Sequence, residues 1–148
     1  MVQHDFKTKV TWHGGRDEVG HLTGDILSHD VSIPSSLGGK GQGTNPDELL
    51  VGAASSCMTI SLAAALERAH LTPLKIDMQS AGTATFENRR FTMTKITHRP
   101  IIQVADEQTM LKLKQRIDSL IQIADKNCMV SNSLRGNVEI EVFPEITY

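Results

Sequence analysis

The sequence of 148 residues contains little of several residue types, and each shortage excludes a class of function. Aromatic residues make up 4% of the chain, too few for the stacking platforms on which single-stranded nucleic acid binds. The formal net charge of −2 gives no electrostatic reason to bind nucleic acid or an anionic membrane. The longest apolar stretch, around residues 62–66, is too short and too interrupted to span a bilayer. We therefore expect neither a nucleic-acid nor a membrane partner.

Cysteine is also scarce: the chain has only Cys57 and Cys128, each followed by a methionine. The opening residues MVQHDFKTKV lack the apolar core of a secretory signal, so we expect a cytoplasmic protein. In that compartment a permanent disulfide is rare, and a transient one is usually catalytic or redox-sensing. The length suits a single domain over residues 1–148 that can bury a core.

The first part of the chain shows strand patterns. FKTKVTW at 6–12 alternates apolar and polar residues, which predicts a half-buried strand, and HLTGDIL and DVSIP predict two further short strands. The segment SSLGGKGQGTN at 35–45 predicts a flexible glycine-rich loop. It lacks the spacing of a phosphate-binding loop, since Lys40 precedes Gly41 rather than closing such a loop.

A helix is predicted from Asn45 to about residue 69. Asn45 is a good N-cap, Pro46 suits the first helical position, and Glu48 completes a capping-box pattern. The following residues are apolar or small on nearly every face, which is typical of a helix buried all round. The helix would be roughly 35 Å long. A domain of this size would struggle to cover it alone, so we expect a second subunit to help.

The second half repeats the order of strands followed by a helix. LKIDMQSAGTATF and RRFTMTKITHRP read as two strands of a hairpin joined at ENRR, and GNVEIEVF as a final strand. Residues 106–127 predict an amphipathic helix. Its apolar residues at helical spacing are Met110, Leu113, Ile117, Leu120, Ile121 and Ala124. The fold class is therefore α+β, with antiparallel strands at both ends, one very buried helix and one amphipathic helix.

The two cysteines leave several interpretations open. Cys57 lies in the middle of the buried helix, where an unreactive core thiol is a common role for cysteine. It is too far from the helix start to gain from the dipole, so a thiolate there needs a cation from elsewhere. Cys128 lies in a polar segment with a turn, where we expect partial accessibility. Neither has the CxxC or HxxxH companion of a zinc site or a protease signature, so we expect no metal and no cofactor.

Three motifs together resemble the OsmC/Ohr family of thiol peroxidases. They are GGRD at 14–17, LGGKGQGTNPDELLVGAASSC at 37–57 and CMVSNSLRGNVEIEV at 128–142, in the family's order and spacing. The resemblance implies an OsmC-like intertwined homodimer, with antiparallel sheets wrapped around long buried central helices and active sites at the subunit interface. It also implies a metal-free, cysteine-based reduction of organic hydroperoxides by a thiol reductant, for which the family suggests a dihydrolipoyl-type dithiol.

The resemblance also assigns roles to individual residues. Cys57 corresponds to the peroxidatic cysteine, Cys128 to the resolving cysteine, and Arg16 to the arginine that stabilises the thiolate. The family's glutamate falls on Asp47, a shorter side chain, so the neighbouring Glu48 is an alternative partner for Arg16. Met129 also departs from the pattern, because hydroperoxide resistance proteins usually have proline there, and the subfamily stays open.

The chemistry of these residue types fits such a site. A thiolate that attacks a peroxide becomes sulfenic acid, and a second thiol condenses with it to a disulfide. Arginine stays charged in apolar surroundings that oppose a thiolate. We expect three residues to line a site for an apolar peroxide, with a role in the core as the alternative: Leu49, Leu50 and Met58.

Asp47 precedes Cys57 by nearly three helical turns, about 15 Å along the axis, so it must act through Arg16 or in the partner's site. Two other functions stay open at this stage. One is a non-enzymatic, thiol-responsive protein that binds a small apolar ligand. The other is a structural dimer with inert thiols.

Overall fold

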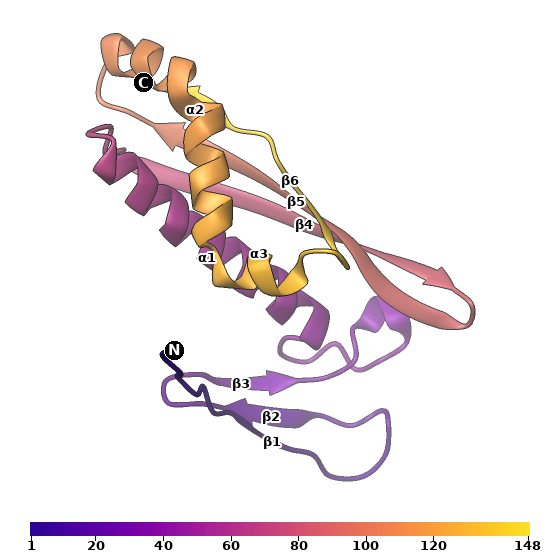
Figure 1. Ribbon diagram of the computed structural model, residues 1–148. Coiled ribbons are helices and arrows are strands. Elements are labelled where there is room, and N and C mark those ends of the chain that lie inside the picture. The colour runs from indigo at the N-terminus through magenta and orange to yellow at the C-terminus, as the bar shows by residue number, and fades with distance from the viewer. The chain divides into compact units, whose positions relative to one another are not determined.

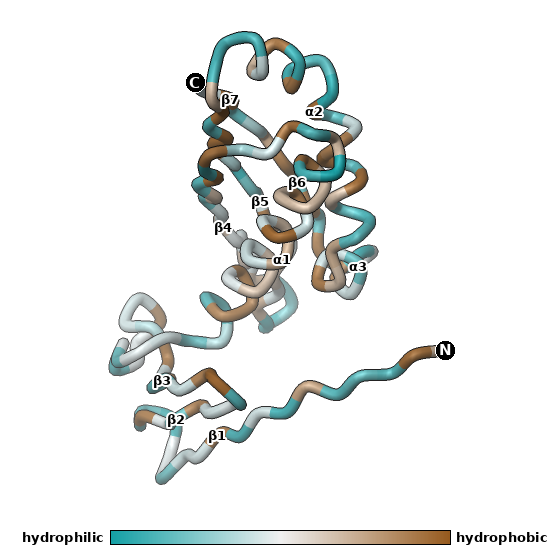
Figure 2. Tube along the Cα trace, turned by 90° about the vertical axis from the view of Figure 1, so that its left-hand side faces the viewer, coloured by the Kyte–Doolittle hydropathy of each residue, from teal (hydrophilic) through white to brown (hydrophobic).

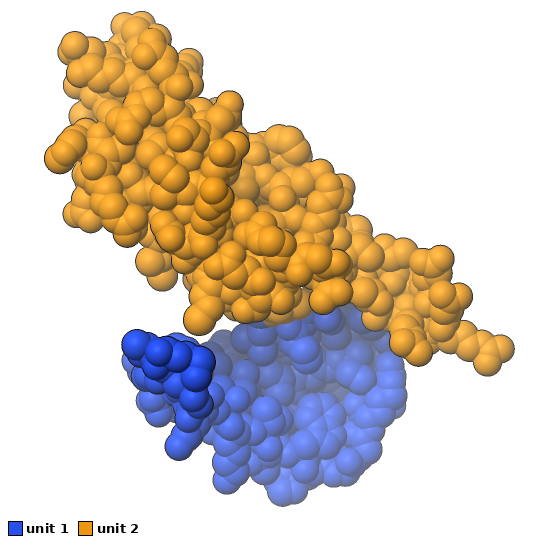
Figure 3. Space-filling view, viewed as in Figure 1, with its two compact units in different colours: residues 1–49 blue, residues 50–148 orange.

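The computed structural model describes all residues 1–148 and contains two compact units, residues 1–49 and residues 50–148 (Figure 3). Each unit combines helical and strand segments, and the predicted α+β class is confirmed. Each unit is described below by itself. The expectation of a single domain over residues 1–148 stays a prediction.

Unit 1 is built on a three-stranded antiparallel sheet in the order β1 (Lys9–Thr11), β2 (Gly20–Thr23) and β3 (Ser28–Val31) (Figure 1). The three predicted strands are all present, although each is shorter than its pattern suggested. The prediction that the first strand is half-buried is wrong for this chain, because all three residues of β1 are exposed. The alternating apolar and polar side chains of β1 are therefore not covered by other residues of unit 1.

The glycine-rich loop after the sheet is held in place by backbone contacts rather than left free, unlike the flexible loop expected. It contains a short 3₁₀ helix, η1 (Ser35–Leu37), and returns to β3 through a bond from the Thr44 N–H to the Asp30 carbonyl at 2.9 Å. Gly43 has a φ of +72°, and a Cβ there would lie 2.1 Å from that carbonyl oxygen. Only glycine fits this turn, because a side chain would be both strained and blocked.

Helix α1 (Pro46–Arg68) begins and ends where the sequence predicted. The Asn45 side chain accepts the Glu48 N–H at 2.9 Å, as an N-cap does. The Glu48 carboxylate accepts a bond from the Thr44 hydroxyl at 2.6 Å. The prediction that this helix is buried all round is wrong for the single chain. Ala54, Met58, Leu62, Ala65 and Leu66 bury one stripe, whereas Ile60 is 71% exposed.

By length and composition α1 could cross a membrane, contrary to the expectation drawn from its short unbroken apolar runs. The core helix of a globular protein passes the same test. One stripe of α1 lies in the hydrophobic core of unit 2, and 28% of the apolar part of the helix is buried within the single chain.

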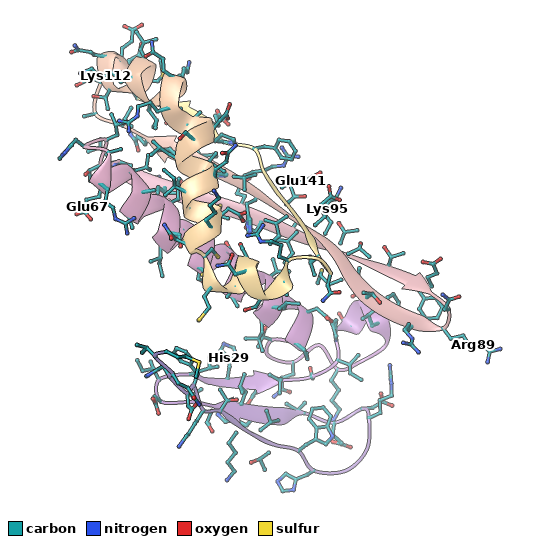
Figure 4. The ribbon with its side chains drawn as sticks, in the orientation of Figure 1. His29, Glu67, Arg89, Lys95, Lys112 and Glu141 are labelled. Carbon is teal, nitrogen blue, oxygen red and sulfur yellow. The ribbon has the colours of Figure 1, made fainter.

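Unit 2 contains a four-stranded sheet around a long hairpin. The predicted hairpin is confirmed as β4 (Lys75–Glu87) and β5 (Arg90–Gln103), and its turn residues Asn88 and Arg89 have positive φ. Arg89 points away from the tip of this hairpin (Figure 4). The strands β6 (Glu139–Val142) and β7 (Glu145–Thr147) both pair with β5 in parallel, so the expectation of only antiparallel strands is wrong. Strand β7 was not predicted.

The helices of unit 2 cover one face of this sheet (Figure 1). The predicted amphipathic helix is confirmed as α2 (Glu107–Asn127), with Asp106 as its N-cap, and its apolar and polar residues alternate in Figure 2. A short helix that was not predicted, α3 (Met129–Leu134), follows it. The main core joins α1, α2 and the sheet, and its fully buried members include Met58, Leu62, Leu66, Ile102, Leu113 and Ala124.

Candidate thiol redox site

Cys57 lies half-buried in the middle of α1, and its thiol is free. It follows the buried Ala54 by three residues and directly precedes the buried Met58, so its side chain is at the edge of the buried stripe. This position gives the thiol contact with the interior and partial access to solvent.

Cys128 lies between α2 and α3 and acts as the N-cap of α3. Its N–H donates to the Asp125 carbonyl at 3.2 Å, and the Ser131 N–H donates to its sulfur at 3.4 Å. The side chain is 0% exposed. The expectation of partial accessibility is wrong, because the polar segment folds into the α3 turn and encloses the thiol instead of forming an open loop.

The structure brings the two cysteines together. The side chain of Cys57 lies close enough to Cys128 to influence its pKa, although the residues are far apart in the sequence. Burial raises the pKa of the Cys128 thiol, and the neighbouring Cys57 thiol raises it further. A thiol with a raised pKa stays protonated and can donate to its neighbour. The pair is thus arranged so that the more accessible Cys57 faces a protonated, enclosed Cys128.

A chain of polar side chains lies in the same unit. The Ser80 hydroxyl on β4 contacts the His98 Nδ1 atom on β5 at 2.6 Å and donates to the Ser55 hydroxyl on α1 at 3.1 Å. His98 is fully buried, and its Nε2 atom has no hydrogen-bond partner. Burial lowers the pKa of His98, and the negative charge of Asp125 acts in the opposite direction. At neutral pH the imidazole is therefore uncharged, with one nitrogen bonded and the other free.

Asp125 connects this chain to the turn that carries Cys128. One carboxylate oxygen, Oδ2, forms an ion pair with Arg135 at 3.0 Å, and Arg135 also donates to the Asn132 side chain at 3.1 Å. The other oxygen, Oδ1, is buried and has no partner. The Ser131 hydroxyl is also buried without a partner. The sequence analysis missed these residues. The only signal was a polar His98 between Ile96 and Pro100, on the buried side of an alternating strand.

Arg16 lies in unit 1, where its side chain is 60% exposed. Its guanidinium pairs with the Asp17 carboxylate at 2.7 Å and donates to the Leu37 carbonyl at 3.3 Å. It therefore connects the GGRD turn to the glycine-rich loop. The bonds that Arg16 makes in this unit are not with Asp47 or Glu48, the two carboxylates expected to orient it.

Unit 1 also contains an apolar groove of about 550 Å³. Asp47 is the only charged residue in its lining, which otherwise consists mainly of apolar side chains from the sheet and the start of α1. Leu49 lines this groove, and Leu50 is half-buried. Met58 is fully buried in the core of unit 2, and packing there accounts for it. The other apolar lining residues are Val10, Trp12, Leu22, Val31, Ile33, Pro34, Leu37 and Pro46.

Comparison with known proteins decides the family. A model of the OsmC-like proteins matches residues 39–143, most of the chain, and includes both cysteines. The chain belongs to the OsmC-like family. The resemblance that the three sequence motifs indicated is thereby confirmed.

Individual relatives of this OsmC-like protein cover nearly its whole length. The uncharacterized protein YmaD of Bacillus subtilis is 38% identical over 144 residues, which is 96% of this chain and 94% of that protein. The peroxiredoxin OsmC of Escherichia coli is 26% identical over 91% of this chain and 93% of its own. An organic hydroperoxide resistance protein from Elizabethkingia anophelis has a similar fold, with a TM-score of 0.76 at 23% identity over 98% of each chain.

Proposed function

We propose that this OsmC-like protein is a cysteine-based peroxidase that reduces organic hydroperoxides at the expense of a thiol reductant. The observation that carries the proposal is the proximity of two free thiols, the half-buried Cys57 and the enclosed Cys128, which influence each other's protonation. The names of the relatives, peroxiredoxin and organic hydroperoxide resistance protein, support the same chemistry. The proposed setting is the cytoplasm, where thiol reductants are available.

In the first step the Cys57 thiolate attacks the outer oxygen of the peroxide. The O–O bond breaks, Cys57 becomes a sulfenic acid, and the alkoxide takes a proton to leave as an alcohol. The Cys128 thiol supports the thiolate by donating a hydrogen bond, since burial keeps Cys128 protonated. The half-buried position of Cys57 allows the peroxide to approach.

In the second step the Cys128 sulfur attacks the sulfenic sulfur. A disulfide forms, and the leaving hydroxide takes up the Cys128 proton and departs as water. The proximity of the two thiols supports this step. A dithiol, for which the family suggests the dihydrolipoyl type, then reduces the disulfide and restores both thiols.

Arg16 is the proposed cation of the active site, with Asp47 or Glu48 as the carboxylate that orients it. Arginine suits this role because it stays charged near apolar groups and can contact both the thiolate and the peroxide oxygens. In the single chain Arg16 pairs with Asp17 and Glu48 with Thr44, so the proposed arrangement requires Arg16 to exchange one carboxylate for another. The exposed position of its side chain makes such an exchange inexpensive.

The proposed assembly is a homodimer with its active sites at the subunit interface. The open apolar groove of unit 1 supports it. A contiguous exposed apolar surface of this kind is commonly covered by a partner or a ligand. Within this proposal Leu49 and Leu50 belong to the apolar surroundings of the substrate, whereas Met58 packs in the core of unit 2.

A peroxidase assay with an alkyl hydroperoxide and hydrogen peroxide in parallel, each with a monothiol and a dithiol, tests the proposal. We expect turnover with the alkyl hydroperoxide and the dithiol, and loss of that turnover to the background rate in Cys57→Ser, since a hydroxyl at this position is no thiolate nucleophile. The variant should keep the thermal unfolding curve of the wild type. Turnover that survives in Cys57→Ser would refute the assignment.

A second function is favoured by the apolar groove of unit 1: a non-enzymatic, thiol-responsive protein that binds a small apolar ligand. This function predicts saturable binding of an apolar fluorescent probe without any consumption of peroxide. Loss of both free thiols on peroxide addition, reversed by a dithiol, would separate the peroxidase from this alternative.

A further inference from the structure

Three side chains on the sheet of unit 1 form a hydrogen-bonded chain that the proposed peroxidase does not use. The Nδ1 atom of His21 lies 2.8 Å from Asp30 Oδ1, and its Nε2 atom lies 2.9 Å from Ser28 Oγ. The Gln42 amide donates to the second oxygen of Asp30, Oδ2, at 3.2 Å. A serine, a histidine and a carboxylate bonded in this order are the arrangement of a serine nucleophile, its base and the group that orients the base.

The register of the β2–β3 hairpin explains why these side chains meet. His21 lies directly opposite Asp30, and Ser28 precedes Asp30 by two residues on β3. Residues two apart on a strand point to the same face, so both partners of His21 lie on one face of the sheet. Leu22 and Val31, which line the apolar groove, alternate with these positions and point to the other face. The three side chains are therefore separate from the groove.

The face of the sheet that carries the three side chains is polar and open to solvent. The side chains of His21 and Asp30 are 46% and 45% exposed, and Ser28 is exposed as well. Lys9 and Thr11 of β1 lie on the same face and are also exposed. An antiparallel sheet commonly packs one face and leaves the other in water. This polar face is therefore accessible to a small molecule, whatever covers the apolar side.

The charge of Asp30 selects the tautomer of His21. The hydrogen bond from His21 lowers the pKa of Asp30, and the bond from Gln42 lowers it further, so the carboxylate is ionised at neutral pH. An ionised carboxylate can only accept, so the ring carries its hydrogen on Nδ1 and donates it to Asp30. In the neutral ring Nε2 is then the acceptor, and the Ser28 hydroxyl donates to it. This is the tautomer in which an imidazole can take a proton from a serine.

We propose that Ser28 is a nucleophile that reacts with small activated esters, with His21 as its base and Asp30 as the residue that positions His21. An open sheet face gives a substrate little binding energy with which to lower the barrier. The site therefore suits esters that are reactive by themselves, such as those with an aryl alcohol as leaving group. This inference concerns unit 1 alone and does not depend on the thiol pair or on peroxide.

The reaction balances with water as its only co-reactant. The Ser28 Oγ atom bonds to the carbonyl carbon of the ester, and the hydroxyl proton passes to His21 Nε2. The bond to the leaving group breaks, and the alcohol departs with that proton. Water then attacks the acyl-serine, and His21 takes one proton from this water and returns it to the Ser28 oxygen as the acid leaves.

A fluorophosphonate probe tests the nucleophile directly, because it forms a stable bond to an activated serine and releases fluoride. Peptide mapping by mass spectrometry follows the labelled fraction of each serine with time. We expect Ser28 to be labelled at least about tenfold faster than Ser36, an exposed serine of η1 in the same unit. Equal labelling of the two serines, or an unlabelled Ser28, would overturn the inference.

Substitutions of the two partners show whether the hydrogen-bonded chain activates Ser28. His21→Gln removes the base and should slow the labelling of Ser28 at least about tenfold. Asp30→Asn should slow it as well, and Asp30→Glu should recover part of the rate because a carboxylate is restored. Thr11→Ala, opposite His21 on the same face, is the matched control and should follow the wild type. Labelling of Ser28 at the wild-type rate in His21→Gln would overturn the inference.

Hydrolysis of p-nitrophenyl acetate measures the complete reaction. Both thiols react with this ester equally in the wild type and in Ser28→Ala, so the difference between the two proteins reports Ser28. We expect continuous release of p-nitrophenolate in the wild type above that of Ser28→Ala, and equal release would overturn the proposed hydrolysis. If the His21 and Asp30 variants do not fold, the comparison of Ser28 with Ser36 in the wild type decides.

Discussion

The two units of the chain differ in how much of their apolar surface they bury. In unit 1 only Leu22 and Val31 are buried apolar residues, whereas all the other buried apolar residues of the chain lie in unit 2. Unit 1 keeps an open apolar groove and exposes Val10 and Trp12. Unit 2 has a closed core of two helices on a sheet and encloses Cys128 within it.

This difference separates two tasks. Unit 2 holds the thiol pair and the buried polar side chains of His98, Asp125 and Ser131. Unit 1 holds Arg16 and the apolar groove, which are exposed in the single chain. The proposed function assigns the thiol chemistry to residues of unit 2, and the cation and the apolar surface to residues of unit 1.

The largest expected effect lies in unit 2. Cys128→Ser should consume about one equivalent of alkyl hydroperoxide and then stall, because the Cys57 sulfenic acid has no thiol with which to condense. Mass spectrometry of the treated variant should show oxygen added to Cys57, with further oxidation as peroxide is increased. Normal turnover of Cys128→Ser with a dithiol would show that resolution does not depend on the enclosed thiol.

A pair of core substitutions measures the difference in packing. Leu62→Ala removes a side chain that is 0% exposed in the core of unit 2, and it should lower the free energy of unfolding by about 2–5 kcal/mol. Val10→Ala removes one that is 55% exposed in unit 1, and it should change this energy by less than about 0.5 kcal/mol in the monomer. Denaturant unfolding at several protein concentrations checks both values. A large, concentration-dependent effect of Val10→Ala would place that strand in an interface.

Arg16 tests whether the open unit serves the thiol pair. We expect Arg16→Ala to slow alkylation of Cys57 about tenfold near neutral pH, because a nearby cation favours the thiolate. Arg16→Lys should recover only part of the rate, since an ammonium lacks the planar fork of donors. Arg90→Ala, at an exposed position of the β5 hairpin, is the control. If the rate of Cys57 alkylation were the same in Arg16→Ala and the wild type at every pH, and were lower in Arg135→Ala, Arg135 would be the cation that stabilises the thiolate.

The smallest expected effect concerns the pH dependence of stability. Burial lowers the pKa of His98 below its ordinary value of 6.5, so below that value the unfolded chain binds a proton that the folded chain resists. The contribution of a neutral His98 is complete above about pH 6.5 and is lost as the pH falls toward the folded value. Between about pH 7 and about pH 5 the wild type should lose more unfolding free energy than His98→Gln, because only the wild type has a buried imidazole that resists protonation. Parallel losses in the two proteins would show that His98 is not kept neutral by the fold.

The sequence predicted the elements whose signals are local. Asn45 marks a helix start by its side-chain cap, and the turn at Asn88 and Arg89 joins two strand-like runs. The parallel pairing of β6 with β5 was not predictable in this way, because it depends on contacts between residues far apart in sequence. The sequence predicts a helix from Pro46 that is buried on every side, because composition does not show which face of the helix the rest of the chain covers.

The sequence predicts those residues of the candidate site whose type and motif indicate the chemistry. The two cysteines and Arg16 are distinctive within their motifs, but His98, Asp125 and Ser131 are common residues without a motif. Their arrangement exists only in the folded unit, where β5, α2 and α3 meet. Cys128 was expected to be accessible since its neighbours are polar, and the α3 turn reverses that expectation by enclosing it.

The central claim is that Cys57 and Cys128 form one redox pair. Its most direct test is to treat the reduced protein with one equivalent of an alkyl hydroperoxide and to map its peptides by mass spectrometry without reduction. We predict a loss of two hydrogen atoms from the intact chain and one cross-linked peptide that joins Cys57 to Cys128, which a dithiol restores to two free thiols. Two thiols that both remain open to alkylation after denaturation, or a disulfide that joins two chains instead, would contradict the claim.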